Sequence, residues 1–428
     1  MKKTLSLILM LALLAASCLV FASCGETKRK GLTEDVLPIN TPTADFTVGS
    51  DFKIGFIFLH DENSTYDKNF IDAANRMKTA LNLTDAQVIK KTNIPESDEC
   101  YTTAADLARQ GCKLVFADSF GHEPYILQAA KEYPDVQFCH ATGTMAHTEK
   151  LPNFHNAFAS IYEGRYLAGI VAGMKLNAMI EEGKITADKA VIGYVGAFTY
   201  AEVRSGLTSF FLGARSVCPT ATMKVQYTGA WYDEAKEQEA ANALIAAGCV
   251  LISQHADSMG APSACEIKGV PNVSYNGSTY SAAPDTFLVS SAINWTPYFM
   301  YIAKCVASST AIAYDWCGGI AEGSVVLSGL NQDIVPEGTK AKLDEAIAKF
   351  RAGTLHVFAL DNFRVENKKL DLNFKADVDT DAGFTPDTAV IKGDAENGYY
   401  FSESTERSAP YFNMCIDGIQ ELNTAFGS

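Results

Sequence analysis

The run Lys53-Ile54-Gly55-Phe56-Ile57-Phe58-Leu59 decides the fold, because it is apolar almost without a break. A strand with one face in water alternates apolar and polar residues, whereas a strand covered on both faces is apolar at nearly every position. Residues 68–81, a short way further on, repeat apolar side chains at helical spacing. A buried strand followed by an amphipathic helix is the repeating unit of a parallel sheet with helices on both faces.

This strand–helix alternation continues along the chain and forms two successive series. The first has further strands at 86–90, 112–117 and 136–140 and helices at 99–110 and 124–132. The second has strands at 190–195, 223–227, 250–254 and 272–275 and helices at 201–213, 234–247 and 261–268. The two series predict an α/β protein with two doubly wound parallel-sheet lobes. Segments 287–293, 298–307 and 339–352 are expected to cross between the lobes at a hinge.

Each predicted lobe therefore combines two separate parts of the chain. Lobe 1 is expected to contain residues 50–165 and 290–315, and lobe 2 residues 166–289 and 316–365. Residues 366–428 are rich in Asp, Asn, Gly and Tyr and have weak periodicity. They are predicted to form a loop-rich C-terminal extension that packs on the lobes.

The first residues have the pattern of an export signal. Lys2 and Lys3 precede the apolar run 5–21, which is short for a membrane-spanning helix and ends in Ala22-Ser23-Cys24-Gly25. Small residues just before a cysteine resemble the lipobox of bacterial lipoproteins. The resemblance implies that residues 1–23 are a signal peptide, that Cys24 is lipidated, and that 24–49 is a linker. The body is then expected outside the cytoplasm, with the lipid as its only contact with the membrane.

Charge, cysteines and motifs exclude several classes of function. The formal net charge of −15 argues against nucleic-acid binding, which needs clustered basic residues. Nine cysteines follow Cys24, none in a CxxC arrangement, and they are expected to be buried free thiols. No metal site and no cofactor are predicted, because no Walker A or GxGxxG motif follows a strand. Ser119, His140, His255 and Asp257 lack a GxSxG elbow, so no enzyme activity is expected.

Polar and aromatic clusters follow the predicted strands directly. They occupy residues 60–67, 118–121 and 140–143 in the first series, and 196–200, 229–233, 254–258 and 276–278 in the second. Ligands of open α/β sheets bind beyond the carboxyl ends of the strands. The two sets of clusters therefore predict a binding cleft between the lobes.

Several of these stretches, taken in order, are similar to the basic membrane protein family of importer-associated lipoproteins. They are Ser64-Thr65-Tyr66-Asp67, Ser119-Phe120-Gly121, His140-Ala141-Thr142-Gly143, Tyr162-Glu163-Gly164-Arg165-Tyr166-Leu167-Ala168-Gly169, Ile192-Gly193-Tyr194-Val195-Gly196, Trp231-Tyr232-Asp233-Glu234-Ala235-Lys236-Glu237 and Gln254-His255-Ala256-Asp257-Ser258. The resemblance implies a periplasmic-binding-protein-like type I fold, an ABC permease as partner, and a purine base or nucleoside as ligand. The protein is expected to be a monomer.

A purine ring has apolar faces and polar edges, so it needs aromatic side chains and a few fixed donors and acceptors. The aromatic candidates are Tyr66, Phe120, Phe198 and Trp231. The polar candidates are Asp61, Asn63, Ser119, Asp257 and Asn276. Asp67 and Asp233 precede predicted helices and are expected to be N-caps, whereas Glu163 and Arg165 are expected to form an ion pair.

Two alternative functions remain open at this point. A sugar or autoinducer-type receptor has the same fold and also uses aromatic, Asp and Asn side chains. A lipoprotein that reports ligand occupancy to a membrane kinase has the same sequence features as an importer subunit. A neighbouring permease and ATPase gene favours import, and an adjacent kinase gene favours sensing.

Overall fold

The computed structural model describes residues 29–379 and 385–426. The chain divides into the units Met1–Gly31 and Leu32–Ser428, and every described helix and strand belongs to the second. The predicted signal peptide and Cys24 lie outside the described residues. In the described part of the chain, no helix has both the length and the apolar character needed to cross a membrane.

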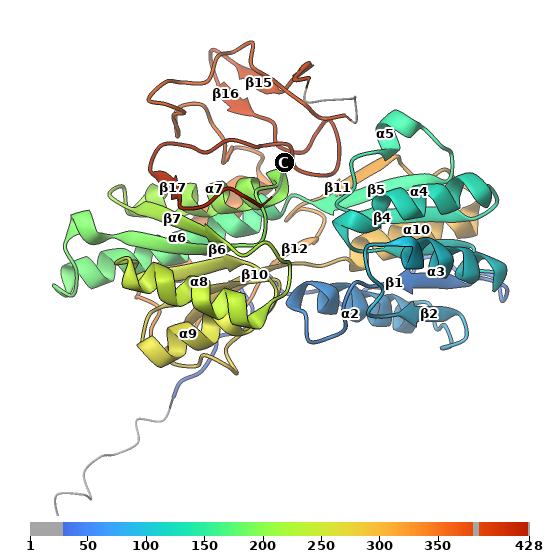
Figure 1. The fold of residues 1–428 in the computed structure, drawn as a ribbon, viewed down its shortest axis with the longest axis horizontal. Helices are drawn as coiled ribbons and strands as arrows, with labels where there is room; N and C mark the ends of the chain where they lie inside the picture. The colour runs from blue at the N-terminus through green and yellow to red at the C-terminus, as the bar shows by residue number, and fades with distance from the viewer. Residues whose placement is uncertain (1–28, 380–384, 427–428) are drawn as a thin grey trace, which may run out of the picture. The chain divides into compact units, whose positions relative to one another are not determined.

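Lobe 1 is built on a six-stranded sheet with the strand order β11-β5-β4-β3-β1-β2, in which all neighbours are parallel. Its strands are β1 (Ile54–Ile57), β2 (Val88–Lys91), β3 (Leu114–Ala117), β4 (Gln137–Ala141), β5 (Phe154–Ala159) and β11 (Asp315–Gly318). Its helices are α2 (Thr65–Ala80), α3 (Asp98–Arg109), α4 (Glu123–Glu132), α5 (Ala146–Glu149) and α10 (Thr296–Ser308). Figure 1 shows this lobe on the right.

The apolar run around β1 is explained by burial on both faces of the sheet. Phe56 contacts Phe299 of α10, with ring centroids 5.0 Å apart. Ile57 belongs to a second hydrophobic cluster, which also contains Leu107 of α3 and Ile126 of α4. Successive side chains of a strand point to opposite faces, so each face of β1 meets its own layer of helices. The prediction of a doubly covered strand is confirmed.

Lobe 2 is built on a seven-stranded sheet with the order β12-β10-β9-β8-β6-β7-β17, parallel except for β12. Its strands are β6 (Val191–Gly196), β7 (Thr222–Tyr227), β8 (Leu251–His255), β9 (Asn272–Tyr275), β10 (Phe287–Ile293), β12 (Val325–Leu327) and β17 (Ile419–Glu421). Its helices are α6 (Ile161–Glu181), α7 (Ala201–Val217), α8 (Glu234–Ala246), α9 (Gly260–Lys268) and α11 (Thr339–Arg351). The two doubly wound sheets confirm the predicted fold class.

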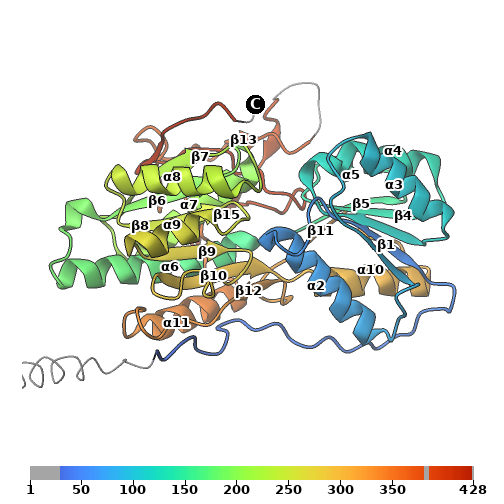
Figure 2. The same ribbon diagram turned by 60° about the horizontal axis from the view of Figure 1, so that its bottom comes forward.

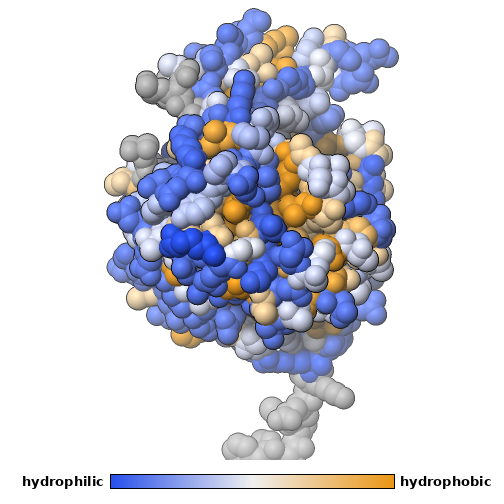
Figure 3. Space-filling model, turned by 90° about the vertical axis from the view of Figure 1, so that its right-hand side faces the viewer, coloured by the Kyte–Doolittle hydropathy of each residue, from blue (hydrophilic) through white to orange (hydrophobic). Residues whose placement is uncertain are grey.

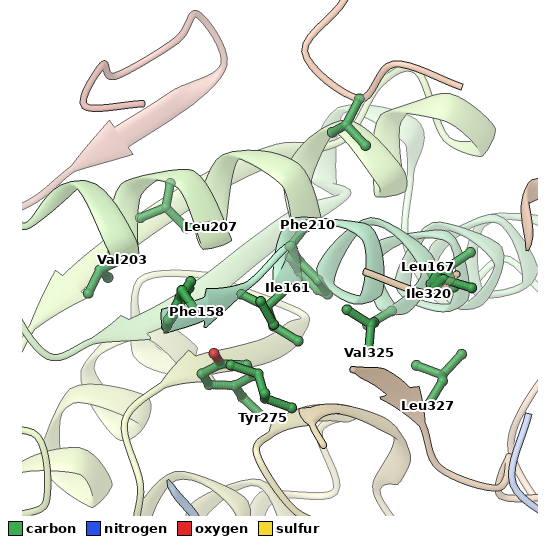
Figure 4. Packing of buried hydrophobic residues seen from close by; sticks show 14 of the residues in the cluster. Phe158, Ile161, Leu167, Val203, Leu207, Phe210, Tyr275, Ile320, Val325 and Leu327 are labelled. Carbon is green, nitrogen blue, oxygen red and sulfur yellow. The ribbon is translucent and has the colours of Figure 1, made fainter. Parts of the chain in front are cut away.

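Helices α6 and α7 pack closely because glycines face each other's backbone. A Cβ added to Gly169 would lie 2.0 Å from the carbonyl oxygen of Phe210, and one added to Gly213 would lie 2.1 Å from that of Tyr166. Only glycine allows so short a separation between the helices. Figure 4 shows Phe210 of α7 in the core that these helices share with Tyr275 of β9.

The structure differs from the sequence expectations at the lobe crossings. β10 pairs with β9 and β12 along its length, so the crossing into lobe 1 follows Ile293 instead of falling at 290. β11 pairs with β5 as far as Gly318, so the return to lobe 2 comes after 315. β5 is a strand that the sequence pattern did not predict, because two polar residues, His155 and Asn156, interrupt its apolar run.

The C-terminal extension lies on both lobes (Figures 1 and 2). It contains two small antiparallel sheets, β13 (Lys375–Ala376) with β14 (Thr388–Ala389) and β15 (Ile391–Asp394) with β16 (Gly398–Phe401). β17 instead joins the lobe 2 sheet, parallel to β7. On the lobe 1 side, Asp315 of β11 accepts hydrogen bonds from the backbone amide and hydroxyl of Ser408, both over 2.7 Å.

The expected ion pair between Glu163 and Arg165 is wrong. Glu163 accepts a hydrogen bond from the backbone amide of Ile320 over 2.7 Å. Arg165 is fully buried, and its guanidinium donates to the Tyr194 hydroxyl and to the Gln254 carbonyl oxygen. The two side chains leave α6 in different directions because neighbouring positions on a helix do not face each other.

The described cysteines are all free, as expected, and Cys317 and Cys415 are the two that are not fully buried. Burial raises the pKa of Cys139 to about 12, so this thiol stays protonated and is a poor nucleophile. Hydrophilic residues predominate on the face shown in Figure 3, with smaller apolar areas between them.

Candidate functional site

A cavity of about 360 Å³ lies between the two lobes, beyond the carboxyl ends of their strands. It is lined by Leu59, His60, Tyr66, Asp67, Ser119, Phe120, Thr142, Glu202, Trp231, His255, Asp257 and Asn276. Strand order reverses at β1/β3 in one sheet and at β6/β8 in the other. Loops diverge at such switch points and leave a crevice, which is the usual ligand site of open α/β sheets.

The first wall of the cavity comes from the start of α2. Ser64 is the N-cap of this helix, and its hydroxyl accepts a hydrogen bond from the Asp67 amide. The expectation that Asp67 caps a helix beginning at residue 68 is therefore wrong, because the helix begins at Thr65. Asp67 is a buried residue of the first turn and accepts hydrogen bonds from the His60 amide over 2.7 Å and the Ser64 hydroxyl over 2.6 Å. Asp233, in contrast, is the predicted N-cap of α8.

The charge of Asp67 is stabilised by these neighbours. Burial alone would raise the pKa of Asp67, but the hydrogen bonds from His60 and Ser64 together hold it below its ordinary value. Asp118, at the end of β3, shows the opposite behaviour. Its full burial and the nearby charge of Asp67 raise its pKa well above the usual range. The floor of the cavity thus combines one ionised carboxylate with one protonated carboxyl group.

Aromatic side chains from both lobes line the cavity. The Tyr66 hydroxyl donates to the Asp118 carbonyl oxygen over 2.8 Å, which fixes the ring against lobe 1. Trp231 follows β7 in lobe 2 and meets the Phe198 ring edge-on, with centroids 4.9 Å apart. Phe120 approaches Tyr200 across the cleft, with centroids 5.2 Å apart. These rings offer flat apolar surfaces to a ligand from both sides.

Asp257 is the buried carboxyl group of lobe 2. It follows β8, and its Oδ1 accepts a hydrogen bond from the Asn276 side-chain amide over 3.3 Å. Full burial, together with the charges of Glu237 and Asp67, raises the pKa of Asp257 well above its ordinary value. Asn276 has a positive φ of 61°, a conformation that asparagine tolerates better than most residues. The turn after β9 therefore holds the amide toward Asp257.

Glu202 and His255 form the remaining polar part of the lobe 2 wall. The His255 Nε2 lies 3.5 Å from Glu202 Oε1. Burial lowers the pKa of His255, although Glu202 opposes this effect, so the imidazole is neutral at physiological pH. None of the described residues that line the cavity is a lysine or an arginine. The site favours a neutral or cationic ligand that has hydrogen-bond donors, because an anion would face carboxylates without a balancing charge.

The serine and histidines near the site do not form a nucleophile–base pair. The Ser119 hydroxyl donates to Glu96 over 2.6 Å, away from either imidazole. His140 Nε2 contacts the backbone oxygen of Ser119 over 2.7 Å, and its pKa is lowered to about 4 by burial. A catalytic serine needs its hydroxyl hydrogen-bonded to the base. The geometry is that of a binding site.

The structure brings six of the nine predicted ligand residues to the cavity wall: Tyr66, Ser119, Phe120, Trp231, Asp257 and Asn276. Phe198 lies behind Trp231 instead of lining the wall. Asp61 and Asn63 do not reach the cavity either, because the Asp61 carboxylate accepts hydrogen bonds from the amide and side chain of Asn63 in a local turn.

Sequence reasoning did not select the other residues of the wall. His60, Asp67, Thr142 and His255 lie within the polar clusters after the strands, so that position was their only signal. Glu202 lies in the first turn of α7, where an acid is usual because it complements the helix dipole. Nothing in the sequence distinguishes such an acid from a ligand-binding one.

The two lobes touch each other around the cavity. The Asn69 side-chain amide of α2 donates to the Asn276 carbonyl oxygen over 2.8 Å. The rings of His60 and Tyr232 lie with centroids 5.6 Å apart. These contacts join loops of opposite lobes, so the cleft is closed over the cavity.

Comparison with known proteins agrees with this geometry. Residues 58–353 match the model of the Bmp family, described as ABC transporter substrate-binding protein PnrA-like. A purine-binding protein of Brucella abortus is 31% identical over 309 residues, which are 72% of this chain and 83% of that protein.

Solved structures share the fold at lower identity. A solute-binding protein of an ABC transporter system from Conexibacter woesei is 22% identical, with a TM-score of 0.57 over 71% of this chain and 98% of that one. Solute-binding proteins of such a system from Aeropyrum pernix are represented by a structure that is 16% identical, with a TM-score of 0.55 over 71% of this chain and 86% of that one. The fold is the type I periplasmic-binding-protein fold.

Proposed function

The chain belongs to the Bmp family of extracytoplasmic ABC transporter substrate-binding proteins, which are not enzymes, and we propose that its ligand is a purine base or purine nucleoside. The ligand lies in the cavity between the lobes, and the closed protein presents it to an ABC permease. The observation that carries the proposal is the composition of the cavity wall. It combines aromatic rings on both sides with buried carboxyl groups and includes no lysine or arginine among its described residues.

Each part of this wall suits one part of a purine. Trp231 and Phe120 offer flat faces for the ring system, and stacking of a base on an aromatic side chain contributes about 1–3 kcal/mol per contact. Asp257 accepts hydrogen bonds from an exocyclic amine or a ring N–H. The carboxyl-rich wall disfavours a phosphate group, so a nucleotide is a poor ligand. The purine-binding relative from Brucella abortus supports the same ligand class.

We further propose that the protein is a lipoprotein that acts as a monomer. Residues 1–23 serve as the signal peptide, and acylation of Cys24 tethers the body to the outer face of the membrane. Residues 24–49 then act as the linker between the lipid and the first strand, β1. A metabolic label such as an alkyne fatty acid, incorporated in the wild type and absent from a Cys24→Ala variant, tests the anchor.

Isothermal titration calorimetry of residues 25–428 tests the ligand class. The titrants are adenine, guanine, hypoxanthine, their nucleosides, ribose and glucose. We expect dissociation constants at or below about 1 μM for at least one purine compound, a value typical of a specific small-molecule site. Tight binding of a sugar without binding of any purine would assign the site to a sugar receptor and reject the proposal.

A further inference from the structure

A second cavity adjoins the first and has the C-terminal extension as one of its walls. Its volume is about 890 Å³, and it shares Phe120, Thr142 and Glu202 with the cavity between the lobes. The extension contributes Arg407, Ala409, Pro410, Asn413 and Thr424 to its lining. We call this space the extension chamber. A ligand bound between the lobes therefore meets the extension chamber on one side.

The wall provided by the extension is firmly attached to the protein. Arg204 of α7 binds both carboxylate oxygens of Glu421, over 3.0 and 3.1 Å, and donates to the Asn413 side chain over 3.0 Å. The Thr199 amide and hydroxyl donate to the Phe426 carbonyl oxygen over 2.7 and 2.6 Å. These bonds keep the chamber wall in place next to the site.

Thr142 lies at the junction of the two cavities and is held in an unusual state. Its φ is 65°, which is rare for a β-branched residue and costs about 1–3 kcal/mol. The residue is 2% exposed, and its hydroxyl has no hydrogen-bond partner within the protein. A buried hydroxyl without a partner is costly, so a strained threonine that presents one to both cavities indicates a polar group of a ligand at this position.

The chemistry of the chamber selects an uncharged, polyhydroxylated group. Its arginines are already occupied, because Arg204 is paired with Glu421 and Arg407 donates to the carbonyl oxygens of Ala409 and Pro410 over 3.2 and 2.9 Å. An anion would therefore lack a free cationic partner among the described residues of this wall. The Thr142 hydroxyl and the Glu202 carboxylate offer a donor and acceptors to hydroxyl groups.

We propose that the extension chamber is a subsite for the sugar of a purine nucleoside, and that the C-terminal extension thereby makes the protein prefer nucleosides to free bases. This inference rests on the proposed purine ligand. The base occupies the cavity between the lobes, and the sugar extends past Thr142 toward the extension. The extension acts as a specificity element that contacts the ligand.

The test compares the affinity for adenosine with that for adenine, and the affinity for inosine with that for hypoxanthine, in the wild type and in a Thr424→Trp variant. Thr424 is an exposed residue of the chamber wall, so a larger side chain fills the chamber without disturbing the core. We expect the variant to bind nucleosides at least tenfold more weakly and free bases within twofold of the wild type. Leu422→Trp is the matched control, because Leu422 is exposed on the same segment and does not line the chamber.

A second variant, Asn413→Trp, narrows the chamber from another exposed position and is expected to give the same selective loss. Thermal unfolding identifies the variants that keep the native fold. An equal loss of affinity for bases and nucleosides, or no loss in either variant, would overturn the subsite while the purine assignment stands. If the wild type binds no purine compound at all, the proposed function itself fails, and the subsite fails with it.

Discussion

The carbonyl oxygen of Asp257 in lobe 2 accepts two hydrogen bonds from Thr65 in lobe 1, one from its backbone amide and one from its hydroxyl, both over 3.1 Å. Thr65 is the first residue of α2, whose amides are free of partners within the helix. The lobes are thus joined directly beside the proposed ligand. A ligand that interacts with Asp257 also favours the closed arrangement, because it holds the same loop against α2.

Thr65→Val removes the hydroxyl while preserving the shape of the side chain. We expect about threefold to tenfold weaker ligand binding, because one hydrogen bond that forms on closure contributes roughly 0.5–1.5 kcal/mol. Calorimetry measures the affinity, and small-angle scattering measures the fraction of open protein. Thr102→Val is the control, since its hydroxyl bonds within α3 to Asp98. An unchanged affinity in the Thr65 variant would mean that this contact does not support closure.

Asp257→Asn is expected to weaken purine binding by at least tenfold, because the amide loses one acceptor and offers a donor in its place. The variant should be at least as stable as the wild type without ligand. The raised pKa means that the carboxyl group's contribution to the free energy of unfolding is present below its unfolded pKa and is lost as the pH rises through the folded pKa. Thermal unfolding at neutral pH checks the second expectation, and a marked loss of stability would instead assign Asp257 a structural role.

Ligand binding is expected to release a proton from Asp257. Its pKa is raised by burial in the empty protein, whereas ligand N–H groups favour the carboxylate, so the affinity should rise with pH between about pH 5 and about pH 8. Calorimetry in buffers of different ionisation enthalpy measures the released proton. In Asp257→Asn the dependence should disappear, and its persistence would assign the proton to another group, such as His60 or His255.

Trp231→Ala is expected to weaken purine binding by about 5- to 150-fold, as follows from about 1–3 kcal/mol for one stacked base. Trp231→Phe should recover most of the affinity, because it keeps an aromatic face. Trp316→Phe is the control, since Trp316 packs on Tyr298 within lobe 1, with centroids 5.1 Å apart. If ligand quenches the fluorescence of the Trp231→Phe variant as strongly as that of the wild type, Trp231 does not contact the ligand.

Gly169→Ala is expected to destabilise lobe 2 by about 1–3 kcal/mol or more, because the added methyl group would overlap the Phe210 carbonyl oxygen and force α6 and α7 apart. Denaturant unfolding measures the loss. Met179→Ala, at a partly exposed position of α6, is the control and should change stability much less. Equal stability of Gly169→Ala and the wild type would show that the two helices separate without cost.

The sequence predicts those parts of the fold that are buried in the same way along their length. The four residues of β1 are fully covered on both faces, so their apolar character alone identifies a central parallel strand. β5 escaped prediction because His155 and Asn156 satisfy their polar atoms inside the lobe. His155 contacts the Ala313 carbonyl oxygen over 3.1 Å, and Asn156 binds the Ala146 amide over 2.7 Å. Both partners are distant in the chain and leave no local signal.

The candidate site shows the same limit. Asp257 and Asn276 were identifiable because each follows a buried strand at the carboxyl edge of a sheet. Asp61 has the same sequence context but turns away, because its nearest donors belong to Asn63. Which acid of a loop reaches a ligand depends on local hydrogen bonds that compete for it, and on the opposite lobe, neither of which a linear pattern contains.

The pairing of β17 with β7 also determines when the chain can finish folding. Ile419 lies beside Met223, almost two hundred residues earlier in the chain. During synthesis or export the chain emerges from its N-terminus, so the edge of β7 stays open until the last residues appear. An unpaired strand edge can recruit other chains. The protein therefore needs protection from aggregation until nearly all of it has emerged, and loss of its last residues should be more harmful than their surface position suggests.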